Sequence, residues 1–475
     1  MAGKKTISRA SVKNMSRYKK HPASYRDPSG FVFEQDGIYY RQVNKLYAAN
    51  YDQLVKSGLY DLLVKEKKML SHTEVEENLT GEENWYRTLL PEQLHFISYP
   101  YEWCFSQWKD AALLTLELLQ TALEHDMILK DATPFNIQFV HGVPVLIDSL
   151  SFEKYDETKP WIAYHQFTEC FIAPLLLASH QSAGLLSMFQ LYPDGIPLRL
   201  VAGMLPFKSL LNIQVWLHIR LPNMLPPDAG SKQKKSPAFS RQKMKHLISN
   251  LFSFVRSLSL PPVRTQWNNY YDETILSEAY LDAKKKIVEG WLQELPGRTV
   301  LDIGTNTGLF AEVAASAGKY TIAVDADTAC IDKLYNRCRK QKINNLTALC
   351  SDIVNPAPAI GWQNEERAAF LERARPDIIL ALALVHHLVI GRNISLQQLV
   401  SFFNAHTTDF LIIEFVPLSD EKAQQLALQR DFRDRAYSED IFEKFFSDCF
   451  AIEEKTVVPF SGRILYRMKK TGIPL

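Results

Sequence analysis

The chain has 475 residues and a nearly balanced charge, with 54 Lys and Arg against 53 Asp and Glu and a formal net charge of +1. This balance gives no indication of a nucleic acid or another polyelectrolyte as partner, and a hydrophobic fraction of 46% is ordinary for a globular protein. The six cysteines form no CxxC pair, which argues against a disulfide framework or a zinc site. Because residues 1–20 also lack the apolar segment of a signal peptide, we expect a cytoplasmic protein with reduced thiols.

The chain begins with a basic stretch and continues with strand and helix signals. Residues 1–26 contain Lys and Arg but no acidic residue, which predicts a basic flexible tail. Residues 30–43 alternate around Asp36 and Gly37, and this pattern predicts a β-hairpin. Residues 47–68 carry leucines at helical spacing and predict a helix.

Residues 111–153 hold polar residues at a spacing typical of phosphoryl transfer. A helix predicted over 111–125 leads to Asp131, Asn136 follows five residues later, and an apolar strand then ends in Asp148. This arrangement resembles the catalytic and metal-binding loops of protein kinases and aminoglycoside-type phosphotransferases. In such enzymes the first Asp takes the proton of the acceptor hydroxyl, while the Asn and the second Asp hold Mg²⁺.

The same stretch departs from the kinase pattern at several points. Leu129 stands where the kinases have a histidine, and Ser149 and Leu150 replace Phe and Gly. No glycine-rich phosphate loop precedes the motif, and Arg41 is the nearest basic residue on a predicted strand. We therefore expect a degenerate kinase-like module kept for binding or scaffolding, with an active phosphotransferase as the alternative.

The middle of the chain contains a long apolar stretch and then a change of composition. Residues 170–192 are long enough to raise the question of a membrane span, but Pro174 and Gly184 interrupt them, so we expect two buried helices and no span. Residues 222–245 are rich in Pro, Gly, Ser and Lys and predict a loop near a domain boundary. Their lysines lack interleaved aromatic residues, so they give no strong nucleic-acid signal.

The strongest motif of the chain is TVLDIGTNTGLF, residues 299–310. Its first residues predict a short buried strand, which ends in a turn that holds Gly304 and Gly308, and an apolar helix follows. A strand, a glycine turn and a helix in this order form a cofactor site, because the turn lets backbone N–H groups approach a ligand closely. An α/β domain in which this turn binds nothing is the alternative.

Three acidic residues make the motif more specific. Asp302 lies inside the first strand, Asp325 closes the strand TIAVD, and Asp352 closes the strand LTALCSD. One carboxylate can accept hydrogen bonds from both ribose hydroxyls, and another can accept from an exocyclic amine. An NAD site is disfavoured because its third glycine is missing.

Together these glycines and acids resemble the class I methyltransferases that use S-adenosylmethionine (SAM). The resemblance implies that Asp302 supports the turn and that Asp325 binds the ribose. It also implies that the turn holds the methionine part of the cofactor and that the residues after the third strand meet the adenine. The residues concerned are Gly304, Asn306 and Gly308 for the methionine part, and Asp352 and Ile353 for the adenine.

The stretch just before the glycine motif begins with aromatic residues. Residues 265–295 continue as a predicted helix, and helices at this place in methyltransferases often close over the cofactor. Trp267, Tyr270 and Tyr271 are therefore candidates for a lid or a substrate wall, and packing between two domains is an equal alternative.

The chain after Asp352 predicts the rest of a parallel sheet. We expect a loop over 355–362, a surface helix over 365–375, a fourth strand over 376–384 and a fifth strand over 410–417. Two final strands over 449–457 and 463–468 would close the sheet in antiparallel fashion, which matches the seven-stranded methyltransferase architecture.

Candidate catalytic residues follow the fourth and fifth strands. His386 and His387 come at the end of the fourth strand, and Glu414 lies on the fifth. Ligands of open α/β sheets bind at this edge, and an imidazole can take a proton near neutral pH. The histidine pair lacks a third ligand for a metal, so we expect no metal site. A purely structural histidine pair is the alternative.

A narrower resemblance rests on several runs of sequence. NPAPAIGWQNEER, LALALVHHLVI, LIIEFVPLSD and SGRILYRM, with DPSGFVFEQDGIYYRQV and DGIPLRL, are similar to the bacterial methyltransferase-like family of the rhizobial host-specific nodulation protein NoeA. The family implies a SAM-dependent enzyme with an attached N-terminal domain. We expect a glycan or a small-molecule hydroxyl as methyl acceptor, and the link to nodulation suggests glycan or surface-saccharide modification only by association. A SAM-binding sensor or scaffold without turnover is the alternative.

The predicted fold is α/β, with a C-terminal Rossmann-like seven-stranded class I methyltransferase domain and an N-terminal α+β kinase-like domain. The predicted boundaries are a tail over 1–26, the kinase-like module over 27–225, a linker over 226–264 and the methyltransferase domain over 265–475. The expected cofactor is S-adenosyl-L-methionine. The amino-methylation signature Asn/Asp-Pro-Pro-Tyr is absent after the fourth strand, which argues against methylation of an adenine or glutamine nitrogen.

Overall fold

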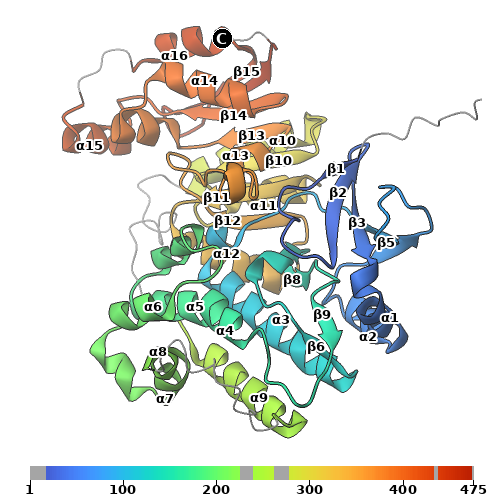
Figure 1. Cartoon of the computed structure of the whole chain (residues 1–475). Helices are drawn as coiled ribbons and strands as arrows, with labels where there is room; N and C mark the ends of the chain where they lie inside the picture. The colour runs from blue at the N-terminus through green and yellow to red at the C-terminus, as the bar shows by residue number, and fades with distance from the viewer. Residues whose placement is uncertain (1–17, 225–238, 262–277, 433–436, 473–475) are drawn as a thin grey trace, which may run out of the picture.

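The computed structural model describes residues 18–224, 239–261, 278–432 and 437–472. These residues form an N-terminal part with a five-stranded sheet and a C-terminal part built on a seven-stranded sheet. Figure 1 shows the two parts in contact, with the C-terminal sheet next to the helices of the N-terminal part. The first seventeen residues of the predicted tail, and the aromatic residues Trp267, Tyr270 and Tyr271, lie outside the described residues.

The C-terminal sheet has the strand order β12-β11-β10-β13-β14-β16-β15. The first five strands in this order are parallel, and β16 pairs antiparallel with both β14 and β15. The strands are β10 (Thr299–Ile303), β11 (Tyr320–Asp325), β12 (Leu346–Cys350), β13 (Ile378–Ala381), β14 (Phe410–Phe415), β15 (Phe450–Val457) and β16 (Ile464–Lys470). The seven predicted strands and their antiparallel closure are therefore confirmed.

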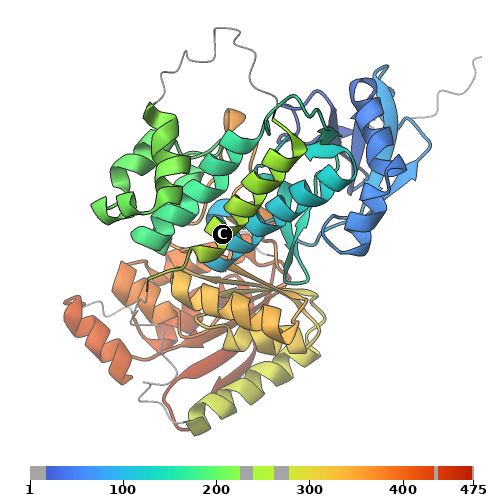
Figure 2. The same cartoon turned by 90° about the horizontal axis from the view of Figure 1, so that it is seen from below.

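Helices cover both faces of this sheet, as Figures 1 and 2 show. Side chains of a strand point alternately to opposite faces, so Ile378 and Leu380 pack with α10 and α11, while Ile379 and Ala381 belong to the core that contains α14. Burial on both faces explains why β13 and β14 are apolar at almost every position. The helices are α10 (Glu278–Glu294), α11 (Leu309–Ser316), α12 (Thr328–Gln341), α13 (Phe370–Arg373), α14 (Leu396–His406), α15 (Glu421–Gln429) and α16 (Glu439–Ser447).

The prediction of a surface helix over 365–375 is wrong for most of this range. The structure has a 3-10 turn, η8 (Trp362–Asn364), and only the single turn of α13. Between them Arg367 forms an isolated antiparallel bridge with Ile360, and Glu366 is 5% exposed. Glu366 pairs with Arg26, and Arg367 stacks over Phe135. These contacts with distant parts of the chain outweigh the local helix signal.

The N-terminal sheet has the order β1-β2-β3-β5-β4 and is antiparallel throughout. The predicted hairpin is confirmed, because β2 and β3 pair around Asp36 and Gly37, which both have positive φ. The helix predicted over 47–68 is split at Gly58, whose φ is +77°. The elements are β1 (Lys19–Lys20), β2 (Gly30–Gln35), β3 (Ile38–Asn44), η1 (Lys45–Tyr47), α1 (Ala48–Lys56), α2 (Leu59–Lys65), β4 (His72–Val75) and β5 (Trp85–Pro91).

A helical region with two small sheets completes the N-terminal part. β6 pairs with β9 and β7 with β8, which places the segment 127–154 beside the long helix α3. The elements are η2 (Pro100–Glu102), α3 (Phe105–Glu124), β6 (Met127–Leu129), η3 (Pro134–Asn136), β7 (Ile137–Val140), β8 (Val143–Leu146), β9 (Phe152–Lys154), α4 (Tyr164–Phe167), η4 (Thr168–Ile172), α5 (Ala173–His180), η5 (Ala183–Gln190), α6 (Leu198–Met204), η6 (Phe207–Leu211), α7 (Ile213–Val215), η7 (Trp216–Arg220), α8 (Leu221–Met224) and α9 (Arg241–Ser257).

Two predictions about the middle of the chain can be compared with these elements. The apolar stretch 170–192 forms helical elements interrupted near Ser182, as expected, and no helix among the described residues is long and apolar enough to cross a membrane. The range 226–264, expected to be a linker, contains α9, which packs on α3. Lys109 of α3 donates hydrogen bonds to the carbonyls of Arg256 and Leu258 at the end of α9.

The two parts of the chain are joined by polar and apolar contacts. Helix α12 of the C-terminal part packs on α3, where Asp332 accepts hydrogen bonds from the backbone and the hydroxyl of Ser106. The guanidinium of Arg373 forms a buried ion pair with Glu102 and stacks over Tyr99. Because these contacts include buried charges, the two parts are held in one arrangement.

Candidate functional site

The glycine turn between β10 and α11 lies at the carboxyl edge of the parallel sheet. The backbone N–H groups of Gly304 and Thr305 both donate to the carbonyl of Val324, at 2.9 and 3.0 Å. Gly304 and Gly308 have φ of +73° and +89°, where residues with a Cβ are strained. A Cβ at position 308 would also lie 2.3 Å from Cδ1 of Leu334, so this glycine lets α12 approach the turn.

Asp302 supports the turn from below. Its side chain is buried, and Oδ2 accepts a 2.5 Å hydrogen bond from the hydroxyl of Thr305. Burial, and then the nearby charge of Asp325, raise the pKa of Asp302 to about 6. This hydrogen bond of Thr305 was not predicted from the sequence, although the position of Thr305 three residues after Asp302 could have suggested it.

Asp325 lies at the end of β11, directly beside the turn. Its Oδ2 accepts a 2.8 Å hydrogen bond from the backbone of Asn306, and its Oδ1 accepts one of 2.8 Å from the backbone of Asp327. Each carboxylate oxygen has a second lone pair, so the group can still accept from two hydroxyls. Burial raises the pKa of Asp325, although the backbone hydrogen bonds oppose the shift.

Asp352 follows β12, the strand next to β11. Its Oδ1 accepts a 3.0 Å hydrogen bond from the backbone of Val354, and its Oδ2 lies 3.7 Å from the guanidinium of Arg392. Ile353 packs against the main hydrophobic core. The structure therefore places Asp302, Asp325 and Asp352 on three adjacent strands, at or just after their carboxyl ends. Arg392 was not identified from the sequence.

The histidine pair begins the turn after β13. His386 is fully buried, and its two ring nitrogens have no hydrogen-bond partner among the described residues. His387 is partly exposed, and the two rings lie 4.0 Å apart. Burial, with the charges of Arg463 and Lys422, lowers the pKa of His387 to about 4, and burial lowers the pKa of His386 well below its usual value. Both imidazoles are therefore neutral at pH 7.

Glu414 of β14 is fully buried in a network of charges. Its Oε2 lies 2.6 Å from Nζ of Lys284, and its Oε1 accepts a 2.8 Å hydrogen bond from the hydroxyl of Tyr280. Burial opposes ionisation, but the charges of Lys284 and Arg463 outweigh it and lower the pKa of Glu414. Oε2 also accepts a 2.6 Å hydrogen bond from the backbone of Ala383.

The contact with Ala383 gives Glu414 a positioning role. Ala383 has φ +52°, a left-handed conformation that costs a non-glycine residue about 1 to 2 kcal/mol. The hydrogen bond to Glu414 holds this strained residue just before His386 and His387. Glu414 is therefore tied by a hydrogen bond to the turn that carries the histidines.

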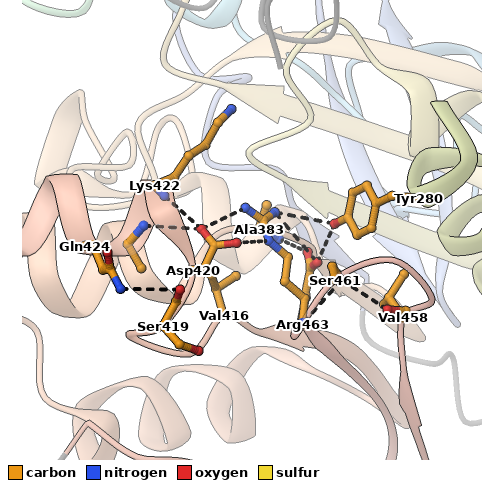
Figure 3. A network of polar contacts seen from close by, with 12 residues as sticks. Tyr280, Ala383, Val416, Ser419, Asp420, Lys422, Gln424, Val458, Ser461 and Arg463 are labelled. Atoms are coloured by element: carbon orange, nitrogen blue, oxygen red, sulfur yellow. Dashed lines mark hydrogen bonds and ion pairs between the residues drawn. The ribbon is translucent and has the colours of Figure 1, made fainter. Parts of the chain in front are cut away.

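Arg463 extends this network toward α15 and was not identified from the sequence. Its Nε lies 2.8 Å from Oδ2 of Asp420, the residue that caps α15, and Figure 3 shows Arg463 between Asp420 and Tyr280. The guanidinium is 1% exposed, so its charge is balanced by buried carboxylates. The edge of the sheet behind the histidines is thus built from paired charges.

A second candidate site is a cavity of about 1040 Å³ between the two parts of the chain. The N-terminal sheet around Arg41, the segment from Asp131 to Asp148 and the C-terminal segment 360–373 all line it. The cavity volume is in the range of pockets that hold small molecules.

The structure brings the three kinase-like residues together at one end of this cavity. The amide of Asn136 donates a 2.9 Å hydrogen bond to Oδ2 of Asp131, and the amide of Gln166 donates one of 2.7 Å to Oδ1. Burial, and then the charge of Asp148, raise the pKa of Asp131. Asp148 itself forms a 2.7 Å ion pair with Arg41 of β3. Neither Gln166 nor the Arg41 pair was identified from the sequence.

The C-terminal part also lines the cavity. The carboxylate of Glu366 lies 3.1 Å from the guanidinium of Arg26, and the guanidinium of Arg367 stacks over Phe135 at 4.2 Å. In the part of the chain that the structure describes, no three His, Cys, Asp or Glu side chains form a group that could hold a metal ion.

The strand order, the glycine turn and the acids on adjacent strands define a Rossmann-like α/β protein of the class I methyltransferase type. No protein-family model matches the chain. The chain belongs to the family of nodulation protein NoeA. It is 30% identical over 458 residues to Nodulation protein NoeA of Rhizobium meliloti (strain 1021), and the match covers 94% of this chain and 95% of that protein.

Two solved structures that resemble this chain each cover less than half of it. One is magnesium protoporphyrin IX methyltransferase (ChlM) from Synechocystis PCC 6803 with bound SAH, with 16% identity and a TM-score of 0.32 over 43% of this chain and 93% of that one. Another is the N-methyltransferase NodS from Bradyrhizobium japonicum WM9, with 13% identity and a TM-score of 0.31 over 41% of this chain and 98% of that one.

Proposed function

We propose that the chain is a methyltransferase that uses S-adenosyl-L-methionine as cofactor. The observation that carries the proposal is the unit formed by the glycine turn and Asp325, whose carboxylate accepts the backbone N–H of Asn306 at 2.8 Å. This unit offers a close backbone approach and a carboxylate for a ribose diol, and the turn lacks the lysine that follows it in a Walker-type triphosphate site. The donor set therefore fits a nucleoside cofactor without phosphate.

In this proposal, different residues at the sheet edge bind different parts of the cofactor. The glycine turn with Asn306 holds the methionine end, and Asp302 supports it through Thr305. Asp325 accepts from the ribose hydroxyls, and Asp352 with Ile353 meets the adenine. When bound, SAM supplies a methyl group on a sulfonium centre that a nucleophile can displace in line.

We assign proton transfer from the methyl acceptor to the histidine pair. His387 is the base candidate with access to solvent. Its lowered pKa leaves the imidazole neutral at pH 7, so it can accept a proton from a hydroxyl, but as a weaker base than an ordinary histidine. His386 packs behind it, and Glu414 positions their turn through Ala383. We propose a small molecule or saccharide with a hydroxyl group as acceptor, because a base is needed for an alcohol nucleophile.

The test of the cofactor is calorimetric titration of the full chain with SAM and with its demethylated product. We expect micromolar binding that is lost in Asp325→Ala and retained in the matched control Asp440→Ala, which removes an exposed carboxylate of α16. A folded wild-type protein that binds neither compound would contradict the methyltransferase assignment. Turnover on a panel of saccharide and small-molecule acceptors separates an enzyme from a SAM-binding sensor, which would bind tightly and transfer nothing.

A second function is favoured by one observation, the meeting of Asp131, Asn136 and Asp148 at the cavity. We propose that this end of the cavity binds a nucleotide with Mg²⁺, held by Asn136 and Asp148, and that Asp131 would take the proton of an acceptor hydroxyl if phosphoryl transfer occurs. Since Arg41 already neutralises Asp148, metal binding must displace this cation, which favours a binding module over an active phosphotransferase.

The second function is tested by titration with ATP, with and without MgCl₂. Binding that requires Mg²⁺ and disappears in Asp148→Ala would support it, and Asp156→Ala, at an exposed position outside the cavity, is the control. Release of ADP in the presence of acceptors would indicate a phosphotransferase. If neither ATP nor ADP binds the folded protein, this second function is refuted and the SAM result stands by itself.

A further inference from the structure

The two most exposed large apolar side chains of the described residues lie close together in the sequence. Phe207 is 85% exposed and Leu211 is 91% exposed, and both belong to η6. Ile213, the first residue of α7, is 67% exposed. Side chains with this exposure have few protein atoms around them, so they project from the surface and do not line a groove.

The next helical turns continue the apolar surface. α7 and η7 form one continuous helical run in which Val215, His218 and Ile219 are buried. Trp216 and Leu217 are 39% and 40% exposed, and with Ile213 they follow the i, i+3, i+4 spacing of a second helix face. The run is therefore apolar on the face that packs inward and also on the face that meets solvent. We call Phe207, Leu211, Ile213, Trp216 and Leu217 the apolar cluster.

The apolar cluster lies at the rim of the molecule. In Figure 1 the helices α6, α7 and α8 project from the lower side, and Figure 2 shows the same green helices at the edge of the N-terminal part. The Rossmann-like sheet and the cavity are elsewhere in the molecule, and neither contains a residue of the cluster. The cluster therefore has no part in either proposed binding site.

The charged residues in the stretch of sequence that carries the cluster are all of one sign. From Gly195 to Met224 the chain has no Asp or Glu, and it contains Arg199, Lys208 and Arg220. Arg199 and Lys208 are exposed. This stretch is thus basic, in a chain whose overall formal charge is only +1.

We propose that the apolar cluster docks on a lipid bilayer with anionic head groups. Projecting Phe, Leu and Ile side chains can enter the acyl boundary of a bilayer, Trp is a residue of the interface, and lysine and arginine attract anionic lipids. A projecting cluster suits a deformable lipid surface better than a protein partner, which would need a matching groove. No described helix can span a membrane, so the contact is peripheral.

The test is flotation of the full chain with unilamellar vesicles of phosphatidylcholine, alone or mixed with phosphatidylglycerol. We expect binding to the mixed vesicles that weakens as salt rises. The double variant Phe207→Ser with Leu211→Ser should lower the vesicle partition coefficient about tenfold or more, since two exposed apolar groups no longer enter the bilayer. The matched control is Phe460→Ser with Leu428→Ser, which removes two side chains that are 74% and 82% exposed on the C-terminal part.

Further readouts separate the possible outcomes. Arg199→Gln with Lys208→Gln should lower binding to mixed vesicles and leave any binding to phosphatidylcholine unchanged. SAM titration of each variant shows whether the fold and the cofactor site are intact, because the cluster lies outside that site. Wild-type protein that floats with neither vesicle, or equal losses in the cluster and control variants, would overturn the proposal. A dimer that Phe207→Ser with Leu211→Ser converts to monomers, without vesicle binding, would assign the cluster to a second copy of the chain and would also overturn it.

Discussion

The backbone N–H of Asn306 donates a 2.8 Å hydrogen bond to Oδ2 of Asp325, which ties the glycine turn after β10 to the end of β11. Asn306 has φ +52°, and asparagine tolerates this left-handed conformation better than most residues. This hydrogen bond therefore joins the turn and the carboxylate into one unit. Changes at either residue should affect cofactor affinity.

Asp325→Asn should weaken SAM binding while the chain stays folded. The amide keeps the shape of the side chain but loses the charge, and a hydrogen bond to a charged acceptor contributes about 1.5 to 3 kcal/mol. We expect the Kd for SAM to rise about tenfold to a hundredfold, measured by calorimetry. Asp440→Asn is the control, and an unchanged Kd in Asp325→Asn would contradict the ribose role.

Gly308→Ala should destabilise the C-terminal part. A Cβ at this position meets Cδ1 of Leu334 at 2.3 Å and forces alanine into φ +89°. We expect the free energy of unfolding to fall by about 2 to 4 kcal/mol in urea titrations, from strain and overpacking together. Gly318→Ala, with φ +79° and no atom within 4 Å of its Cβ, isolates the backbone strain, and a loss of about 1 to 2 kcal/mol is expected there. Equal losses in the two variants would show that the contact with Leu334 has no cost.

Glu414→Gln should remove a pH-dependent part of the stability. Its folded pKa is lowered, so the carboxylate stabilises the fold above its usual pKa of 4.5, and this contribution is lost as the pH falls through the lower folded value. The variant leaves the buried Lys284 without its 2.6 Å partner, and we expect a loss of about 3 to 5 kcal/mol at pH 7. Urea unfolding at pH 7 and at falling pH measures both effects. Glu439→Gln, in an exposed pair with Lys455, should cost less than about 1 kcal/mol.

His387→Gln should lower the turnover number and leave the Kd for SAM unchanged. Because the pKa of His387 is about 4, the imidazole is already neutral at pH 7, and its contribution to the rate should rise with pH through about 4 and stay level above it. Loss of a general base typically costs a factor of about 10² to 10⁴ in kcat. His406→Gln, at the end of α14, is the control. A kcat within a factor of about two of wild type would refute the proton-transfer role.

Arg373→Ala should destabilise the whole chain and not one part alone. The substitution leaves the carboxylate of Glu102, which is 1% exposed, buried without its ion-pair partner. We expect a loss of about 3 to 5 kcal/mol and one unfolding transition seen both by tryptophan fluorescence and by circular dichroism. Arg339→Ala, whose guanidinium is 52% exposed beside Asp110, should cost less than about 1 kcal/mol. Two separated transitions in the wild type would show that the parts unfold independently.

The sequence predicted the strand pattern well because strand signals are local. The apolar runs at 300–303, 320–325 and 410–415 would be buried in any arrangement of a parallel sheet, so they needed no knowledge of their neighbours. The helix predicted over 365–375 failed for the opposite reason. Its local pattern suits a helix, but Glu366 and Arg367 form contacts with residues of the N-terminal part.

The candidate cofactor residues could also be found from the sequence, since each follows a predicted strand and parallel strands end at one edge. The partners of these residues could not be found in this way. Lys284, Arg463 and Ala383 come from separate elements and meet Glu414 only when α10, β16 and the turn after β13 pack around β14. This packing surrounds Glu414, a predicted base candidate, with buried charges and ties it to the histidine turn.

By itself, the sequence determined the alternation of strands and helices, the glycine turn and the order of the acids, because these depend on the spacing of residues along the chain. Only the tertiary structure decided which charges are paired, how far each histidine is exposed, and that segment 360–373 closes the cavity beside Asp131. These properties depend on desolvation and on contacts between residues that are far apart in sequence. Such contacts exist only after the two parts of the chain have packed together.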